Sequence, residues 1–315
     1  MFAPADTRTK DTRTKLSARM KPRTRTLPRV FEKSSDLTFT STRTLLQYGH
    51  ATGKLAVRGA VPVDGDVMEL LLDARDAQER NKLLSDTAYG RFTAEATNLT
   101  EFEAGLDAAR ANAVNLLAEA QMDPSFEAYF RVTAAYQAGS EHEYFAEKME
   151  LAQATGVAFL VQTTRLEIDC ANVRLLMRKR AAGMSAQELA DKDSLIREGS
   201  LGTAQLLRAY RSTEREGGDD GGSVALHELA VELTKLGPFR AVDPAALEDV
   251  YTLDIALRGV QERNLARALR LGVGPETVVA YVLRVYSETD LLRALMVGLD
   301  NKVDRQLLRR YVVVE

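Results

Sequence analysis

Two long stretches of this chain contain neither proline nor glycine, and they constrain the fold more than any other feature. They cover residues 157–182 and 276–297. Because an α-helix rises about 1.5 Å per residue, each stretch can form a helix about 35 Å long. In the second stretch, Val278, Val282 and Val285 recur at helical spacing. This period is typical of amphipathic helices, so we expect long helices to dominate the fold.

The prolines beyond residue 62 stand where helices would begin. Asp123-Pro124 and Asp243-Pro244 each place an N-cap acceptor before a proline at the first helical position. Gly237-Pro238 and Gly274-Pro275 are typical of one helix ending and another starting. The sequence therefore predicts an all-α, multi-lobed fold. Helices are expected near residues 64–85, 99–121, 124–138, 141–156, 157–182, 185–198, 203–216, 223–236, 244–271, 275–297 and 302–311.

The first part of the chain has a different composition. Residues 1–33 carry ten basic and three acidic side chains, and so a net charge of +7, against −3 for the whole chain. Apolar residues are few there and show no period, so we expect residues 1–45 to be a basic, disordered extension. Its positive charge could bind nucleic acid or anionic lipid, and its composition is typical of a transit peptide. The alternative is a solvated extension without a binding role. No aromatic residue lies between Phe2 and Phe31, which argues against nucleic-acid binding.

The clearest internal boundary is a glycine- and aspartate-rich loop at 217–222. We expect it to separate the N-terminal and middle helical lobes, 46–216, from a C-terminal helical lobe, 223–315. The single cysteine, Cys170, excludes a disulfide within the chain and a cysteine-based zinc site. No apolar run approaches the length of about 20 residues that a membrane helix needs. These features indicate a soluble protein of a reducing compartment.

Some segments of the sequence match catalytic motifs only in part. Gly49–Lys54 resembles a phosphate-binding loop, but it is one residue short and Leu55 replaces the serine or threonine that holds magnesium. His227-Glu228 begins like a zinc-protease helix, but Val231 stands where the second histidine is needed. Cys170 lies among apolar residues without a motif that supplies a base. We therefore expect neither an enzyme nor a bound cofactor or metal.

Two helical segments carry a similar polar stripe. Glu167, Asp169 and Asn172 match Glu288, Asp290 and Arg293 in spacing, and a glycine follows the leucine-rich remainder of each segment. Such stripes can contact another protein, or they can form an intramolecular network or a solvated face. The candidate interface residues are Glu167, Asp169, Asn172, Arg174, Arg178, Glu288 and Arg293.

At these residues the chain resembles a family of central-stalk proteins, the C-type subunits of bacterial and archaeal V/A-type rotary ATPases, which are called d-type in the eukaryotic V-ATPase. Residues 281–299 resemble that family's closing helix, and residues 166–183 its helix of acidic, asparagine and arginine residues. Leu84–Gly90 resembles its Thr-x-Tyr-Gly turn, and residues 48–58 its usual start. The interval from Tyr89 to Glu167 is short for a complete first lobe of the three that the family has.

The resemblance implies a funnel- or socket-shaped, non-catalytic part of an ATP-hydrolysing or ATP-synthesising complex. Such a protein couples the other central-stalk subunits to the membrane rotor ring, in proton or sodium transport. It lies on the cytoplasmic face of the membrane as a peripheral part of the complex and needs no cofactor or small-molecule substrate. The alternatives from the residues alone are a free-standing helical scaffold or regulatory protein, and a helical enzyme with a polar pocket.

Overall fold

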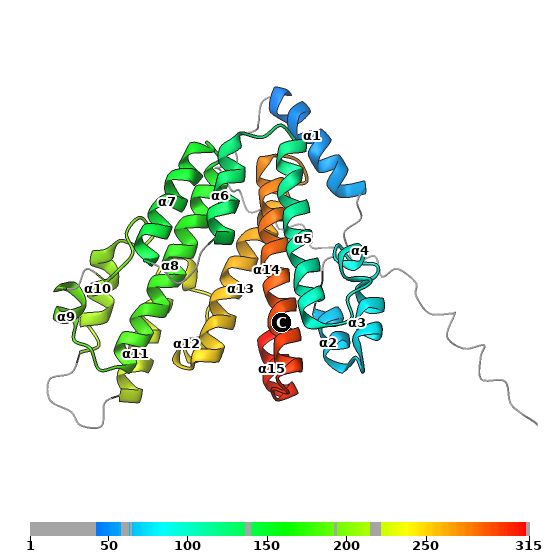
Figure 1. The fold of residues 1–315 in the computed structure, drawn as a ribbon. Coiled ribbons are helices and arrows are strands. Elements are labelled where there is room, and N and C mark those ends of the chain that lie inside the picture. The colour runs from blue at the N-terminus through cyan, green and yellow to red at the C-terminus, as the bar shows by residue number, and fades with distance from the viewer. Residues whose placement is uncertain are drawn as a thin grey trace, which may run out of the picture. The chain divides into compact units, whose positions relative to one another are not determined.

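A computed structural model describes residues 42–57, 63, 65–135, 140–191, 194–214 and 222–312. Within these residues all regular elements are helices, so the predicted all-α class is confirmed (Figure 1). Most of the predicted basic extension and of the 217–222 loop lies outside the described residues. The described helices are α1 (Thr42–Val57), α2 (Gly65–Asp73), α3 (Ala77–Leu84), α4 (Gly90–Thr93), α5 (Leu99–Glu119), α6 (Pro124–Ala135), α7 (Glu141–Ala154), α8 (Ala158–Ala181), α9 (Ala186–Asp191), α10 (Thr203–Arg211), α11 (Gly222–Thr234), the 3-10 helix η1 (Gly237–Phe239), α12 (Ala245–Glu248), α13 (Val250–Leu269), α14 (Pro275–Asp300) and α15 (Arg305–Val312).

The two stretches without proline or glycine form the longest described helices, α8 and α14. Pro124 and Pro275 each occupy the first helical position, as the sequence predicts. Asp123 caps α6 by accepting a hydrogen bond of 2.9 Å from the Ser125 amide. Gly274 precedes α14 with a φ of 141°, a backbone conformation that residues other than glycine rarely adopt. These features fix where both helices begin.

Two predicted helices are broken by an aspartate. The helix expected at 64–85 is divided into α2 and α3, because Asp76 accepts a hydrogen bond of 2.8 Å from the Glu79 amide and so starts a new helix. The helix expected at 244–271 is divided at Asp249, which accepts a hydrogen bond of 3.2 Å from the Thr252 amide. Helix α1 begins at Thr42, so the last residues of the expected extension are helical.

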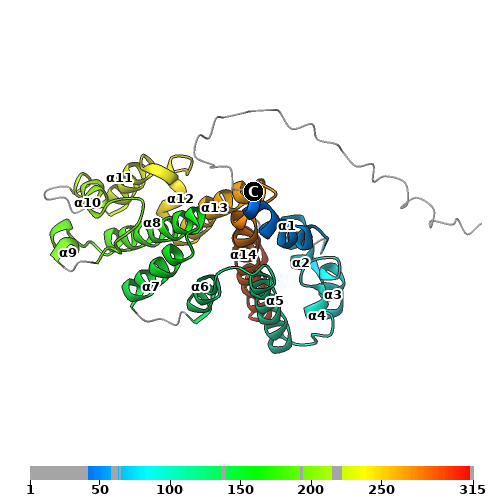
Figure 2. The ribbon, with the colours of Figure 1, turned by 90° about the horizontal axis from the view of Figure 1, so that it is seen from above.

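Among the described residues, most of the core lies in two large hydrophobic clusters that share two helices, beside a smaller third cluster around Phe145 and Ile168. One cluster draws on residues 51–160 and 265–312, and the other on residues 166–260. Both α8 and α13 pass from one cluster to the other. Helix α13 packs against α8 and α14, and α14 packs against α5, an order that Figure 2 shows from above. The second cluster thus joins residues on both sides of the 217–222 segment.

Helix α14 is buried along much of its length. Its side chains Val278, Val282, Leu292 and Leu295 are completely buried. Full burial of such a side chain stabilises a fold by about 1.5 to 3 kcal/mol. None of the described helices is long and apolar enough to cross a membrane.

Candidate functional site

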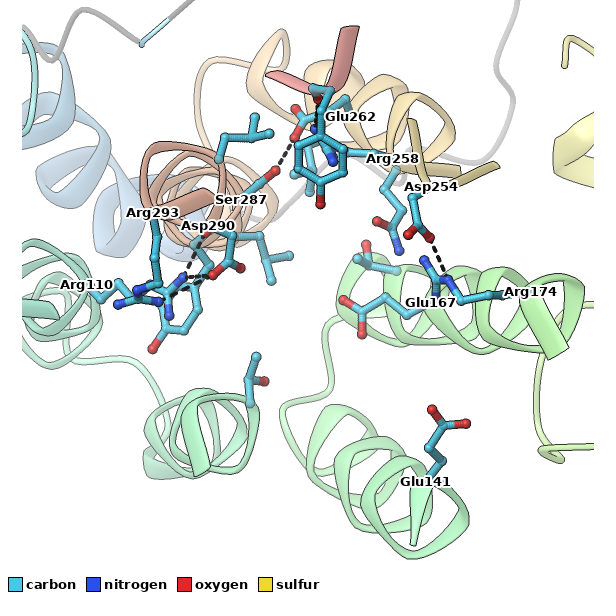
Figure 3. Close-up of a pocket in the computed structure, with 18 of the residues that line it drawn as sticks. Arg110, Glu141, Glu167, Arg174, Asp254, Arg258, Glu262, Ser287, Asp290 and Arg293 are labelled. Carbon is cyan, nitrogen blue, oxygen red and sulfur yellow. Dashed lines mark hydrogen bonds and ion pairs between the residues drawn. The ribbon is translucent and has the colours of Figure 1, made fainter. Parts of the chain in front are cut away.

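A polar cavity of about 820 Å³ opens between helices that are distant in the sequence. Its walls come from α5, α6, α7, α8, α13, α14 and α15, and Figure 3 shows α14 and α8 on opposite sides of it. Charged side chains of both signs dominate the lining. The arginines are Arg110, Arg174, Arg178, Arg258 and Arg293, and the acids are Glu141, Glu167, Asp254, Glu262 and Asp290.

On one side, Arg110 of α5 is held against α14. Its Nε donates a hydrogen bond of 2.6 Å to Thr289 Oγ1, and its Nη2 donates one of 3.1 Å to the Tyr286 carbonyl. It also forms an ion pair with Asp290, and its guanidinium lies 4.8 Å from the centre of the Tyr286 ring. Arg110 is therefore a fixed part of the α5–α14 contact.

Arg293 ties the same two helices together from α14. It lies 2.8 Å from Asp107 and 3.7 Å from Glu103, both on α5, and 3.6 Å from Asp290. The acids are largely exposed, and exposed ion pairs contribute only about 0 to 1 kcal/mol each. We expect this network to set the register of α5 on α14 more than to stabilise the fold.

On the other side, α8 and α13 form an arginine-rich wall. Arg174 Nε lies 2.7 Å from Asp254 Oδ1, with both side chains about one-third exposed. Arg258 donates a hydrogen bond of 2.7 Å to the Tyr311 carbonyl and covers the Tyr311 ring. Arg178 is exposed and has no hydrogen-bond or ion-pair partner for its side chain among the described residues.

Glu167 reaches the cavity from a buried ion pair. Its carboxylate lies 2.5 Å from Lys148 Nζ, and the Lys148 side chain is only 3% exposed. Lys148 also donates a hydrogen bond of 3.1 Å to the Tyr144 hydroxyl and lies 5.1 Å from the centre of the Tyr129 ring. Burial alone lowers the pKa of Lys148, but the Glu167 carboxylate together with Tyr129 and Tyr144 outweighs it and the pKa is raised. The lysine is therefore charged at neutral pH.

The cavity brings together four of the seven predicted interface residues, which are Glu167, Arg174, Arg178 and Arg293. The other three, Asp169, Asn172 and Glu288, lie in the interior of the chain and not on an accessible face. Their polar groups are engaged by other parts of the chain, as an intramolecular network would require.

Asp169 and Asn172 fasten the segment before α10 to α8. Asn172 exchanges two hydrogen bonds of 2.8 Å with the backbone N–H and carbonyl of Ile196. Asp169 accepts hydrogen bonds from the amides of Ser200 and Leu201 at 3.2 and 3.0 Å. Burial raises the pKa of Asp169 to about 6, although these hydrogen bonds oppose the shift. Both residues thus serve the fold.

Glu288 fastens the Thr-x-Tyr-Gly turn to α14. It accepts a hydrogen bond of 2.8 Å from the Tyr89 hydroxyl and pairs with Arg284 at 2.6 Å. The amide of Val63 lies 3.4 Å from the same carboxylate. Burial raises the pKa of Glu288, and the Arg284 charge opposes that shift. Two segments singled out in the sequence, 84–90 and 281–299, therefore meet at this carboxylate.

Sequence reasoning missed several cavity residues on α13. Asp254, Arg258 and Glu262 follow one another at intervals of four, which places them on one face of the helix. This polar stripe runs along a helix that otherwise contributes Leu257, Val260 and similar residues to the core. The stripe was visible in the sequence, but its position on the cavity depends on how α13 packs against α8 and α14.

The segments that match catalytic motifs in part do not have the structures that those motifs require. Residues 49–54 lie inside α1, so their backbone N–H groups belong to a helix and not to a phosphate-binding loop. His227 Nδ1 lies 2.7 Å from Glu248 Oε1 at the surface. Cys170 is buried, and burial raises the pKa of its thiol, so a reactive thiolate is disfavoured. Among the described residues no group of three or more histidine, cysteine or acidic side chains has the arrangement of a metal site.

No protein-family model matches this sequence, and no curated protein matches it either.

Proposed function

We propose that this chain is a non-catalytic coupling subunit of a V/A-type rotary ATPase. In this role it binds the central-stalk subunits on one side and the membrane rotor ring on the other. It transmits torque between ATP chemistry and proton or sodium transport, and it neither binds nor hydrolyses nucleotide. The protein is then a peripheral part of a membrane complex on the cytoplasmic face.

The observation that carries this proposal is the charged cavity and the origin of its walls. The two helices on which the family resemblance rests most, α8 and α14, lie on opposite sides of the cavity (Figure 3). Residues of both signs line it, which suits contact with a protein surface that carries complementary charges. The cavity therefore supports the proposal as a binding site for the end of the central stalk.

A protein that transmits torque must also resist deformation under load. Helix α14 is held between α5 and α13, and its apolar side chains pack in the core. Protein interiors are packed as densely as organic crystals, so such a helix transmits strain with little compression. The wall that α14 contributes to the cavity is thus supported from both sides.

Assembly tests the proposal. The full chain is mixed with the separately purified stalk subunits and rotor ring of the rotary ATPase from the same source, and complexes are separated by size. We expect one complex that contains stalk, chain and ring, and no ATP hydrolysis by the chain alone. A chain that binds neither stalk nor ring would point to the free-standing scaffold, and ATP hydrolysis by the pure chain would also overturn the proposal.

A further inference from the structure

The two sides of the cavity differ in how their charges are balanced. On the α5–α14 side, Arg110 and Arg293 face Asp290, Asp107 and Glu103 of the same chain. Each guanidinium there has at least one carboxylate partner. That side therefore has no positive charge left to offer an incoming partner.

The α8–α13 wall, which we define by Arg174, Arg178, Asp254 and Arg258, has a surplus of positive charge. Asp254 pairs with Arg174 at 2.7 Å. Arg178 lies one helical turn beyond Arg174, and Arg258 lies one turn beyond Asp254. Neither Arg178 nor Arg258 forms an ion pair with a described residue, because the Arg258 hydrogen bond goes to the neutral Tyr311 carbonyl. Two guanidinium charges thus face the cavity without a carboxylate from the described part of the chain.

The remaining acids of the cavity do not supply that carboxylate. Glu167 is engaged by Lys148 at 2.5 Å, and Glu262 accepts a hydrogen bond of 2.6 Å from Ser287 Oγ. Glu141 lies on α7 and has no ion pair with a described residue. Figure 3 shows Glu141 and Glu262 on separate helices, apart from each other.

We infer that the α8–α13 wall is the docking surface for a carboxylate-bearing segment of a partner protein, and that Arg178 and Arg258 determine its specificity. A guanidinium matches a carboxylate with two parallel hydrogen bonds, so these arginines favour glutamate or aspartate. Helices α8 and α13 run antiparallel, because Arg174 pairs with Asp254 and Asn264 bonds to Thr163. The two arginines therefore lie on opposite sides of the Arg174–Asp254 pair, and Glu141 and Glu262 repel a compact polyanion. A segment with acids spaced along its length fits this arrangement better than a small anion. The inference rests on the proposed function for identifying the partner as a stalk protein.

Peptide binding to the full chain tests the inference. Three labelled helical peptides of equal length are compared by fluorescence anisotropy, with one face made of glutamate, glutamine or lysine. We expect the glutamate peptide to bind most tightly and to weaken as salt rises, because the Debye length falls from about 10 Å at 0.1 M to about 3 Å at 1 M. Arg178→Ala and Arg258→Ala should each weaken its binding by about twofold to fivefold. Arg208→Ala, an exposed arginine of α10 outside the cavity, is the matched control and should leave binding unchanged.

The outcomes separate this inference from the proposed function. Unchanged glutamate-peptide binding in Arg178→Ala overturns the inference, and so does tighter binding of the lysine peptide. Arg178 has no side-chain partner among the described residues, so Arg178→Ala should have the same melting temperature as the native chain. A change in peptide binding then reports on the docking surface and not on the stability of the fold. If the chain fails to assemble with stalk and ring but binds the glutamate peptide through both arginines, the proposed function falls and the inference stands. If assembly is normal and Arg178→Glu leaves it unchanged, the inference falls and the proposed function stands.

Discussion

The ion pair between Lys148 and Glu167 gives the sharpest test of the packing around the cavity. Replacing Glu167 by glutamine keeps the size of the side chain but leaves the buried ammonium of Lys148 without its carboxylate. Removing one partner of a buried pair costs about 3 to 5 kcal/mol. The Tyr144 hydroxyl and the rings of Tyr129 and Tyr144 lie near the ammonium in the native chain and in the variant alike, so they do not reduce this cost. We therefore expect Glu167→Gln to lower the free energy of unfolding by about 3 to 5 kcal/mol.

Urea denaturation of the full chain measures this change as a lower midpoint with an unchanged slope. The matched control is Glu127→Gln, the same substitution in the exposed ion pair of Glu127 with Arg131, which should cost less than about 1 kcal/mol. Adding Lys148→Met to Glu167→Gln removes the unpaired charge, so the double variant should recover part of the loss. A Glu167→Gln variant as stable as Glu127→Gln would refute the reasoning.

Three further predictions concern the contacts of Asp169 on α8 and the basic N-terminal extension. Because the folded pKa of Asp169 is raised above its unfolded value, its protonation favours the folded state, and the native chain should gain about 1 kcal/mol relative to Asp169→Asn when the pH falls from about 7 to about 5. Thermal melts of the native chain and of Asp169→Asn at the two pH values measure this. The same shift in melting temperature for both chains would contradict it. Gly199→Ala would place its Cβ 2.3 Å from Asp169 Oδ1, so we expect a loss of about 1 to 3 kcal/mol in urea denaturation, and an unaltered midpoint would contradict the described contact. Removal of residues 1–41, which lack apolar periodicity, should leave the melting temperature unchanged, and a drop of several degrees would show that they contribute to the fold.

The helices were predictable where local signals act alone. The length of α8 follows from the absence of proline and glycine, and the starts of α6 and α14 follow from Pro124 and Pro275. Helix α14 continues past Gly298 to Asp300, so the glycine does not end it as expected. The breaks at Asp76 and Asp249 were not predicted, because an aspartate inside a helical pattern can cap a new helix or sit on its surface. Only the neighbouring backbone decides between the two.

The candidate site was predictable in part. The sequence places Glu167, Asp169 and Asn172 on one helix but does not say which of them faces the cavity. Asp169 and Asn172 are buried because the segment 196–201, far along the chain, supplies their backbone partners. Glu288 is buried for the same kind of reason, since its partner Tyr89 is distant in the sequence. The pairing of distant segments therefore separates structural from accessible polar residues.

The proposed coupling role is tested most directly on membranes that contain the whole rotary ATPase. ATP hydrolysis and ion transport are measured in parallel on the same membranes, with this chain present, removed and added back. A coupling protein joins the catalytic head and its stalk to the membrane rotor ring without performing chemistry. Its removal should therefore leave ATP hydrolysis by the catalytic head largely intact. Ion transport should fall to background without the chain and return when it is restored. Ion transport that continues at its normal rate without the chain would contradict the account.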